Sequence, residues 1–284
     1  MAEAKLDRDD IKTWVQRHIA SLAARDIPSF MAGIHADINV IWPRAAWAGW
    51  DQVQAALTQQ LNKMETIRFY LRRLLIDVQQ SVAAIEWVCR YVDQPTNICY
   101  EFLGGAALDF TGEGQLYRCQ IHLDFDRSGV VSALEAPWPQ EQWSPGVDPG
   151  PPPSRTQSEQ FLHTYAGAWS NNDAETIGQL LHDDVYLCPP WAYREGKEEV
   201  EAVAHYHFAN FLDTRVTPQR IIFDESQPYF GVCQQTFACT NPKTGQHGQD
   251  ADFAFFEICQ GKLRYWRNYF DTGRSIQDDY KNMD

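Results

Sequence analysis

The chain has 284 residues, a hydrophobic fraction of 44% and a formal net charge of −14 at pH 7. This charge repels a phosphate backbone and argues against nucleic acid as a partner. The N-terminus lacks the apolar stretch of a signal peptide, and no apolar run approaches the roughly 20 residues of a membrane-spanning helix. Seven cysteines without a CxxC motif are expected to be free thiols. We therefore expect a cytoplasmic protein without a membrane partner.

The sequence contains two copies of one pattern, at residues 11–125 and 158–272, with an offset of 147. The coinciding pairs include His35/His182, Asp37/Asp184, Pro43/Pro190, Gly49/Gly196, Val53/Val200, Asp77/Asp224 and Asp124/Asp271. A repeat of this length is a whole domain rather than a solenoid unit. We expect a first domain at residues 1–136, a linker with seven prolines at 137–155 and a second domain at 156–284.

Each copy is expected to start with helices and to end with strands. In the second copy, apolar residues recur at helical spacing over 161–169, and Asp173, like Asp26 in the first copy, is a plausible N-cap of the next helix. The remaining predicted elements are a helix at 174–181, a strand at 185–188, a helix at 197–211, and strands at 220–224, 231–240, 249–259 and 262–270. Helices followed by a sheet indicate the α+β class.

Several stretches resemble the NTF2-like superfamily. AWSNNDAETIGQLLHDDVYLCPP, EGKEEV and GKLRYWRNYFD in the second copy are similar to the SnoaL and limonene-epoxide hydrolase branches. WVQRHIASLAARDI in the first copy is similar to the first helix of ketosteroid isomerase. The resemblance implies two fused cones, in each of which three helices cover a strongly curved antiparallel sheet around one pocket. Many members dimerise through the sheet face, so the fused copies are expected to form a monomeric pseudo-dimer.

The resemblance to ketosteroid isomerase implies two hydrogen-bond donors to a developing enolate oxygen. The first-helix tyrosine of that family falls at Tyr165 in the second copy and at His18 in the first. Its buried, protonated aspartic acid falls at Asp252 or Asp250. A carboxyl group in an apolar pocket can stay neutral and donate. On a strand, Asp252 shares its face with Ala254 and Phe256, and it is a pocket group only when that face is the inner one.

The first copy lacks these carboxyl groups, because gapless alignment places Gly105 and Leu103 at the positions of Asp252 and Asp250. The proton-shuttling aspartate of ketosteroid isomerase is also missing from both copies. Its position holds Trp42 in the first copy and Pro189 in the second, and neither can accept a proton. Steroid isomerisation by the known route is therefore not expected.

The Asp-Arg-Asp set of limonene-epoxide hydrolase is altered at all three positions. The final aspartate becomes Asn268, and the other two positions fall at Gln235 and Phe237. An amide cannot shuttle a proton, so that hydrolysis mechanism is not expected. Asn268 is expected to point inwards, where its side chain can donate and accept hydrogen bonds, for a ligand or for the fold.

Further substrate contacts are expected on the strands and at the pocket mouth. Arg90 shares the aligned position of Phe237 and is expected to face inwards beside His18. Cys188 is a candidate nucleophile or an inert buried thiol. The expected substrate contacts are His18, Trp42, Arg90, Tyr186, Cys188, Trp191, Tyr193, Gln235 and Phe237. For the aromatic residues among them, plain packing is the alternative.

These features predict a cofactor-independent enzyme that acts on a small, largely apolar or aromatic metabolite by acid–base chemistry. Isomerisation, cyclisation or elimination suits it best, mainly in the second copy, with Tyr165, Asp252 and Asn268 as the catalytic residues. No metal site is expected, because no zinc spacing is present. The alternative is a non-catalytic small-molecule binding or accessory protein.

Overall fold

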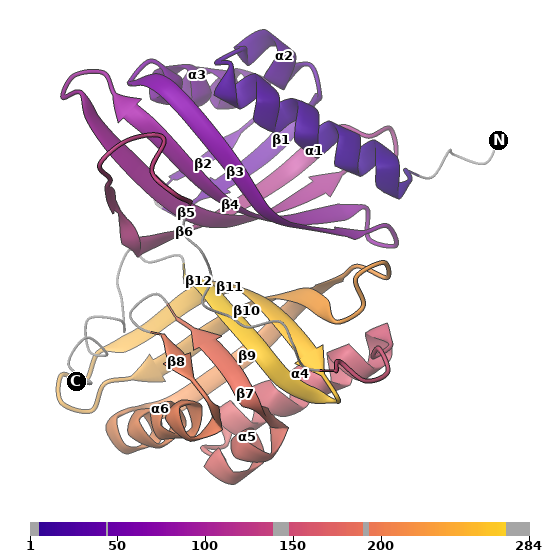
Figure 1. Ribbon diagram of the computed structural model, residues 1–284, viewed down its shortest axis with the longest axis vertical. Coiled ribbons are helices and arrows are strands. Elements are labelled where there is room, and N and C mark those ends of the chain that lie inside the picture. Colours follow the sequence, from indigo (N-terminus) through magenta and orange to yellow (C-terminus); the bar gives the residue numbers. More distant parts are fainter. Residues whose placement is uncertain (1–5, 44, 139–147, 190–192, 271–284) are drawn as a thin grey trace. The chain divides into compact units, whose positions relative to one another are not determined.

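The chain divides into two compact units, Met1–Gln140 and Glu141–Asp284 (Figure 1). The computed structural model describes residues 6–43, 45–138, 148–189 and 193–270, without the side chains of residues 125–127. No helix within these ranges is long and apolar enough to cross a membrane.

Both units have the same order of elements, with helices before the long strands. The first unit contains α1 (Arg8–Ala23), α2 (Ile27–Met31), β1 (Ile34–Trp42), β2 (Ala45–Ala48), α3 (Trp50–Leu61), β3 (Met64–Asp77), β4 (Val82–Asp93), β5 (Ile98–Phe110) and β6 (Leu116–Val130). The second contains α4 (Arg155–Ser170), α5 (Ala174–Leu180), β7 (Leu181–Cys188), β8 (Arg194–Glu195), α6 (Lys197–Asn210), β9 (Leu212–Phe223), β10 (Phe230–Thr240), β11 (His247–Cys259) and β12 (Lys262–Phe270). The duplicated α+β arrangement is therefore confirmed.

Each unit has one six-stranded sheet, and its helices cover one face of that sheet (Figure 1). The strand orders are β2-β1-β6-β5-β4-β3 and β8-β7-β12-β11-β10-β9. The sheets are mixed rather than purely antiparallel, because β1 runs parallel to β6 and β7 runs parallel to β12. A parallel neighbour requires a long connection, which the third helix and four strands of each unit provide.

Local sequence signals explain where the helices begin. The side chain of Asp26 accepts a hydrogen bond from the backbone N–H of Ser29, and Asp173 does the same for Thr176. Both predicted N-caps are therefore confirmed. Each satisfies a donor that has no partner within its own helix.

Candidate active site

The second unit encloses a cavity of about 70 Å³ between its helices and the inner face of its sheet. An apolar cavity of about 150 Å³ holds one benzene molecule, so this space suits a ligand group of only a few non-hydrogen atoms. Thirteen described residues line it: Tyr165, Trp169, Leu187, Pro189, Val203, Val216, Gln235, Phe237, Asp250, Asp252, Trp266, Asn268 and Phe270.

Asp252 is the central polar group of this cavity. Its Oδ2 accepts two hydrogen bonds of 2.7 Å, one from Nε2 of Gln235 and one from Nδ2 of Asn268. Its Oδ1 is buried and has no hydrogen-bond partner among the described residues. A buried oxygen in this state is a vacant acceptor, or the oxygen that carries the proton when the group is neutral.

Strand register brings these three side chains together. Gln235 on β10 pairs with Asp252 on β11, and Ala254 on β11 pairs with Asn268 on β12. Asp252 and Ala254 are two residues apart and share one face of β11. That face is the inner one, because Ala254 belongs to the core and Asp252 is only 2% exposed. The alternative in which Asp252 is solvated is thereby excluded.

Burial changes the acid–base behaviour of Asp252. Loss of solvation raises the pKa of Asp252 to about 7, although the hydrogen bonds from Gln235 and Asn268 oppose this. The neighbouring charge of Asp250, which also lines the cavity, adds to the increase. Close to neutral pH, Asp252 therefore exists both as a carboxylate and as a carboxylic acid, which is the condition for efficient proton transfer.

Tyr165 on α4 also lines this cavity. Its side chain is buried and packs against Trp266, with 5.4 Å between ring centroids. Burial raises the pKa of Tyr165 to about 12; a hydrogen bond with the Trp169 side chain opposes this increase, and the charge of Asp252 adds to it. Tyr165 therefore remains a protonated donor at neutral pH.

Six of the candidate residues named from the sequence line this cavity: Tyr165, Asp250, Asp252, Asn268, Gln235 and Phe237. The sequence reasoning missed two tryptophans, Trp169 and Trp266, that also line it. Their spacing could have revealed them. Trp169 lies one helical turn after Tyr165, and Trp266 shares a strand face with Asn268.

Three of the expected substrate contacts lie away from the cavity. Leu187 lines it, so the side chains of Tyr186 and Cys188 on either side of Leu187 point to the opposite face of β7. Tyr186 stacks on Tyr265 at 6.0 Å, and Tyr193 is 48% exposed and contacts Tyr186. The structure contradicts the prediction for these three residues. Trp191 lies outside the described residues.

The two units differ by one residue in the hairpin that precedes β4 and β10. The hairpin between Phe223 and its partner Gly231 is one residue longer than that between Ile76 and its partner Ala83. The hairpin between β5 and β6 is one residue longer than its counterpart and restores the offset. A shift of one residue moves every side chain of a strand to the other face. The gapless alignment was therefore wrong across β4 and β5.

With the correct register, Trp87 and Gly104 of the first unit replace Gln235 and Asp252. Trp87 pairs with Gly104 as Gln235 pairs with Asp252. A Cβ atom at Gly104 would lie 2.5 Å from Cζ2 of Trp87, so the indole ring occupies the place of the carboxyl group. Ile121 stands at the position of Asn268. The first unit therefore lacks the polar groups of the candidate site.

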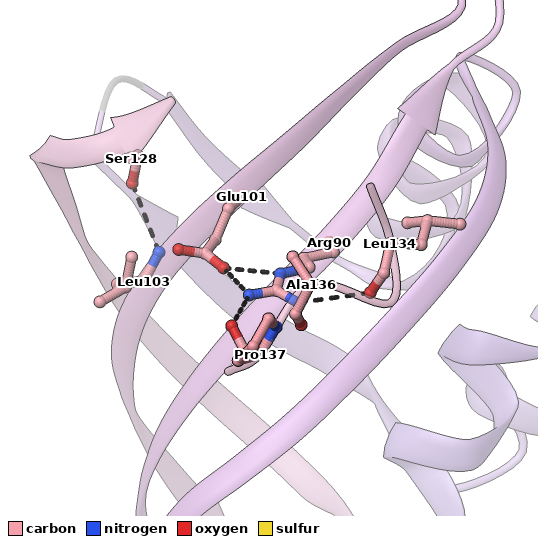
Figure 2. Close-up of polar contacts among 7 residues, drawn as sticks. All are labelled: Arg90, Glu101, Leu103, Ser128, Leu134, Ala136 and Pro137. Carbon is pink, nitrogen blue, oxygen red and sulfur yellow. Dashed lines mark hydrogen bonds and ion pairs between the residues drawn. The ribbon is translucent and has the colours of Figure 1, made fainter. Parts of the chain in front are cut away.

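The guanidinium group of Arg90 contacts Glu101 and the segment that follows β6 (Figure 2), whereas the sequence predicted that Arg90 faces a pocket beside His18. Its guanidinium group forms an ion pair of 2.6 Å with Glu101 and donates to the backbone carbonyl groups of Leu134, Ala136 and Pro137. Arg90 is only 2% exposed. The hydrogen bonds of Arg90 therefore hold the segment that follows β6 against the sheet of the first unit.

His18 and Trp42 are packing residues of the first unit. His18 stacks on Trp14 at 3.5 Å, and its Nδ1 lies 2.7 Å from the carbonyl oxygen of Trp14, which can only accept a hydrogen bond. Burial lowers the pKa of His18 to about 4, so the ring is neutral at pH 7. Trp42 packs against the core near Trp47. The predicted substrate contacts are therefore replaced by core contacts at both residues.

Residues 162–266 match the family model of the SnoaL-like domain. The second unit is a SnoaL-like domain. Its element order and mixed, helix-covered sheet agree with the NTF2-like fold expected from the sequence, and the first unit repeats both. No curated protein matches the chain in the sequence comparison.

Solved structures of low sequence identity resemble parts of this chain. One, an LEH-like epoxide hydrolase from M. tuberculosis, is 20% identical, with 45% of this chain and 90% of that chain covered and a TM-score of 0.38. Another is the epoxide hydrolase/cyclase-like enzyme SalBIII of pyran ring formation in salinomycin, which is 10% identical, with 44% of this chain and 98% of that chain covered and a TM-score of 0.41. TsrD from Streptomyces laurentii is 17% identical, with 42% of this chain and 90% of that chain covered and a TM-score of 0.37. Below 25% identity, such likeness concerns the fold alone.

Proposed function

We propose that the SnoaL-like domain is a cofactor-independent enzyme that transfers a proton on a small, largely apolar substrate. The observation that carries this proposal is Oδ1 of Asp252, which lacks a partner among the described residues and belongs to a carboxyl group with a pKa near 7. Perturbed titratable groups in a cavity are typical of active sites. The proposed reaction class is isomerisation, cyclisation or elimination.

In the proposed mechanism, the two amides hold Asp252 while its other oxygen reacts. Gln235 and Asn268 both donate to Oδ2, so a proton on the carboxyl group resides on Oδ1. The carboxylate takes a proton from the substrate at Oδ1, and the resulting acid returns it to another atom. This exchange requires no large movement of the protein, because the amides fix the orientation of the carboxyl group.

Tyr165 has the role of a neutral donor in this proposal. Its hydroxyl group stays protonated at neutral pH and can stabilise negative charge that develops on a substrate oxygen. A preorganised donor in a site that excludes water contributes about two to three orders of magnitude in rate. Asn268 acts as a positioning residue, because it holds Asp252.

Hydrogen–deuterium exchange tests the proposal without knowledge of the natural substrate. A panel of small ketones, enones and amino ketones is incubated with the full chain in D₂O, and loss of acidic C–H signals is followed by NMR. We expect exchange in at least one compound, with a decrease of about 100-fold or more in Asp252→Asn and in Tyr165→Phe. Equal exchange by the wild type and Asp252→Asn would contradict the proposal. The exposed substitution Asp184→Asn is the matched control.

A binding or accessory function is the second candidate. It is favoured by the first unit, where Trp87 and Gly104 replace the polar pair of the candidate site. In this second candidate, the first unit has no catalytic role. A ligand that binds the second unit in an Asp252-dependent manner and is released unchanged, with no proton exchange, would establish this function instead.

A further inference from the structure

The cavity lining combines aromatic rings with negative charge. Five of its thirteen described residues are aromatic, and two are aspartates. None of the thirteen is Lys, Arg or His. Aromatic faces carry partial negative charge and attract cations, most strongly where water is excluded. The composition of the lining therefore favours a cation over an anion.

The hydrogen bonds of Asp252 favour a ligand that donates. Both amide donors approach Oδ2 and stabilise the charged carboxylate, whereas Oδ1 has no donor among the described residues. A charged N–H donor is the strongest partner for such an oxygen. The second carboxyl group, on Asp250, adds negative potential at the same wall of the cavity.

Size and net charge restrict the ligand further. The cavity of about 70 Å³ admits a group of a few non-hydrogen atoms. The chain carries a formal charge of −14, which raises the local concentration of cations around it. A compact alkyl group with one charged nitrogen meets both conditions.

We propose that this cavity binds a small alkylammonium group, whose N–H donates to Oδ1 of Asp252 while its alkyl part packs against the aromatic rings. The inference rests on the proposed function only in that it uses the same carboxyl group. It names a class of ligand, compact amines, which occupy the oxygen used for proton transfer and therefore compete with the substrate of the proposed reaction. Among the described residues, Asp250, Tyr165 and Cys233 are the titratable groups that interact electrostatically with Asp252, and all three are uncharged or negative at pH 8.

Two probes of nearly equal shape test this inference. The full chain is titrated at pH 8 with tert-butylammonium chloride and with tert-butanol at matched ionic strength, and binding is followed by saturation-transfer NMR of the methyl groups. We expect the ammonium ion to bind at least about tenfold more tightly than the alcohol. We expect this preference to disappear at pH 5.5, where Asp252 is protonated. Equal affinity for the two probes, or no binding of either, overturns the inference.

The variant Asp252→Asn gives a second measurement. The carbonyl oxygen of an asparagine here can accept from both Gln235 and Asn268, which turns its NH₂ group towards the cavity. We expect the affinity for tert-butylammonium to fall at least about tenfold and that for tert-butanol to stay unchanged. Full ammonium binding by this variant, with Asp184→Asn as control, overturns the inference.

The deuterium-exchange assay separates this inference from the proposed function. If deuterium exchange depends on Asp252 but the ammonium ion is not preferred, the ammonium site is refuted and the proposed enzymatic function stands. If the ammonium ion is preferred but no exchange occurs, the proposed enzymatic function is refuted and the ammonium site stands.

Discussion

Trp87 lies directly over Gly104, with Cζ2 at 2.5 Å from where a Cβ atom of residue 104 would be. The corresponding pair in the second unit, Gln235 and Asp252, forms a hydrogen bond at the cavity. One strand pair thus carries an apolar contact in one copy and a polar site in the other. The duplication preserved the fold and changed the chemistry at this point.

The substitution Gly104→Ala is expected to destabilise the first unit. The new methyl group would lie 2.5 Å from Trp87 and 2.9 Å from the carbonyl oxygen of His122, so neighbouring atoms must move. We expect a loss of about 1–3 kcal/mol in the free energy of unfolding, measured by urea denaturation. Gly112→Ala is the control, because nothing lies within 4 Å of its new Cβ. In a double-mutant cycle with Trp87→Leu, additive effects would contradict a direct clash.

Asp252→Asn is expected to change how stability depends on pH. The raised pKa of Asp252 means that the folded protein binds this proton more tightly than the unfolded chain does. Between about pH 4 and pH 7, the wild type therefore loses stability as the pH rises. The variant should match the wild type near pH 4 and exceed it by up to about 4 kcal/mol at pH 8. A constant difference across this range, measured by urea denaturation, would argue against the raised pKa.

The substitution Asn268→Leu is expected to raise the pKa of Asp252 further. Asn268 donates to Oδ2 and thereby stabilises the charged form, so its removal favours the neutral acid. We expect the titration midpoint of the Asp252 carboxyl group to rise by about one pH unit. The measurement is ¹³C NMR of the aspartate carboxyl carbons as a function of pH. A midpoint that falls or stays fixed would show that Asn268 does not act through this bond.

Arg90→Met is expected to destabilise the first unit strongly. It leaves the buried carboxylate of Glu101 without its partner and three carbonyl groups without their donor. Loss of one partner of a buried ion pair costs about 3–5 kcal/mol in the free energy of unfolding. The double substitution Arg90→Met with Glu101→Leu should recover part of this loss.

A matched control for Arg90 lies on the surface of the same unit. Arg68 pairs with Glu135 at 2.8 Å, but the two side chains are 52% and 67% exposed. The substitution Arg68→Met should therefore change the free energy of unfolding by less than about 1 kcal/mol. Similar losses in both variants, measured by urea denaturation, would contradict the assigned role of Arg90.

The sequence predicted the fold and part of the site because both rest on local patterns. Helical spacing predicted α4, the family resemblance predicted inward positions for Tyr165 and Asn268, and strand alternation grouped Asp252 with Ala254 on one face without deciding which face is the inner one. These regularities depend on neighbouring residues alone. They are therefore readable without knowledge of the strand partners.

The remaining features depend on register and on distant partners. A difference of one residue between two hairpins was invisible in a gapless alignment, and it gave Arg90 the wrong face of β4. The bond from Gln235 to Asp252 joins residues 17 positions apart on different strands. The pKa near 7 of Asp252 follows from burial, which outweighs the opposing hydrogen bonds from Gln235 and Asn268, and not from the residue type.

Arg90 binds the carbonyl group of Pro137, which is 47 positions later in the chain. During translation, the arginine therefore emerges from the ribosome before its last acceptor does. The final hydrogen bonds of the first unit form only after the residues beyond β6 have emerged. A truncation or gene fusion made directly after Val130, where the last strand ends, would therefore remove the acceptors of a buried guanidinium group.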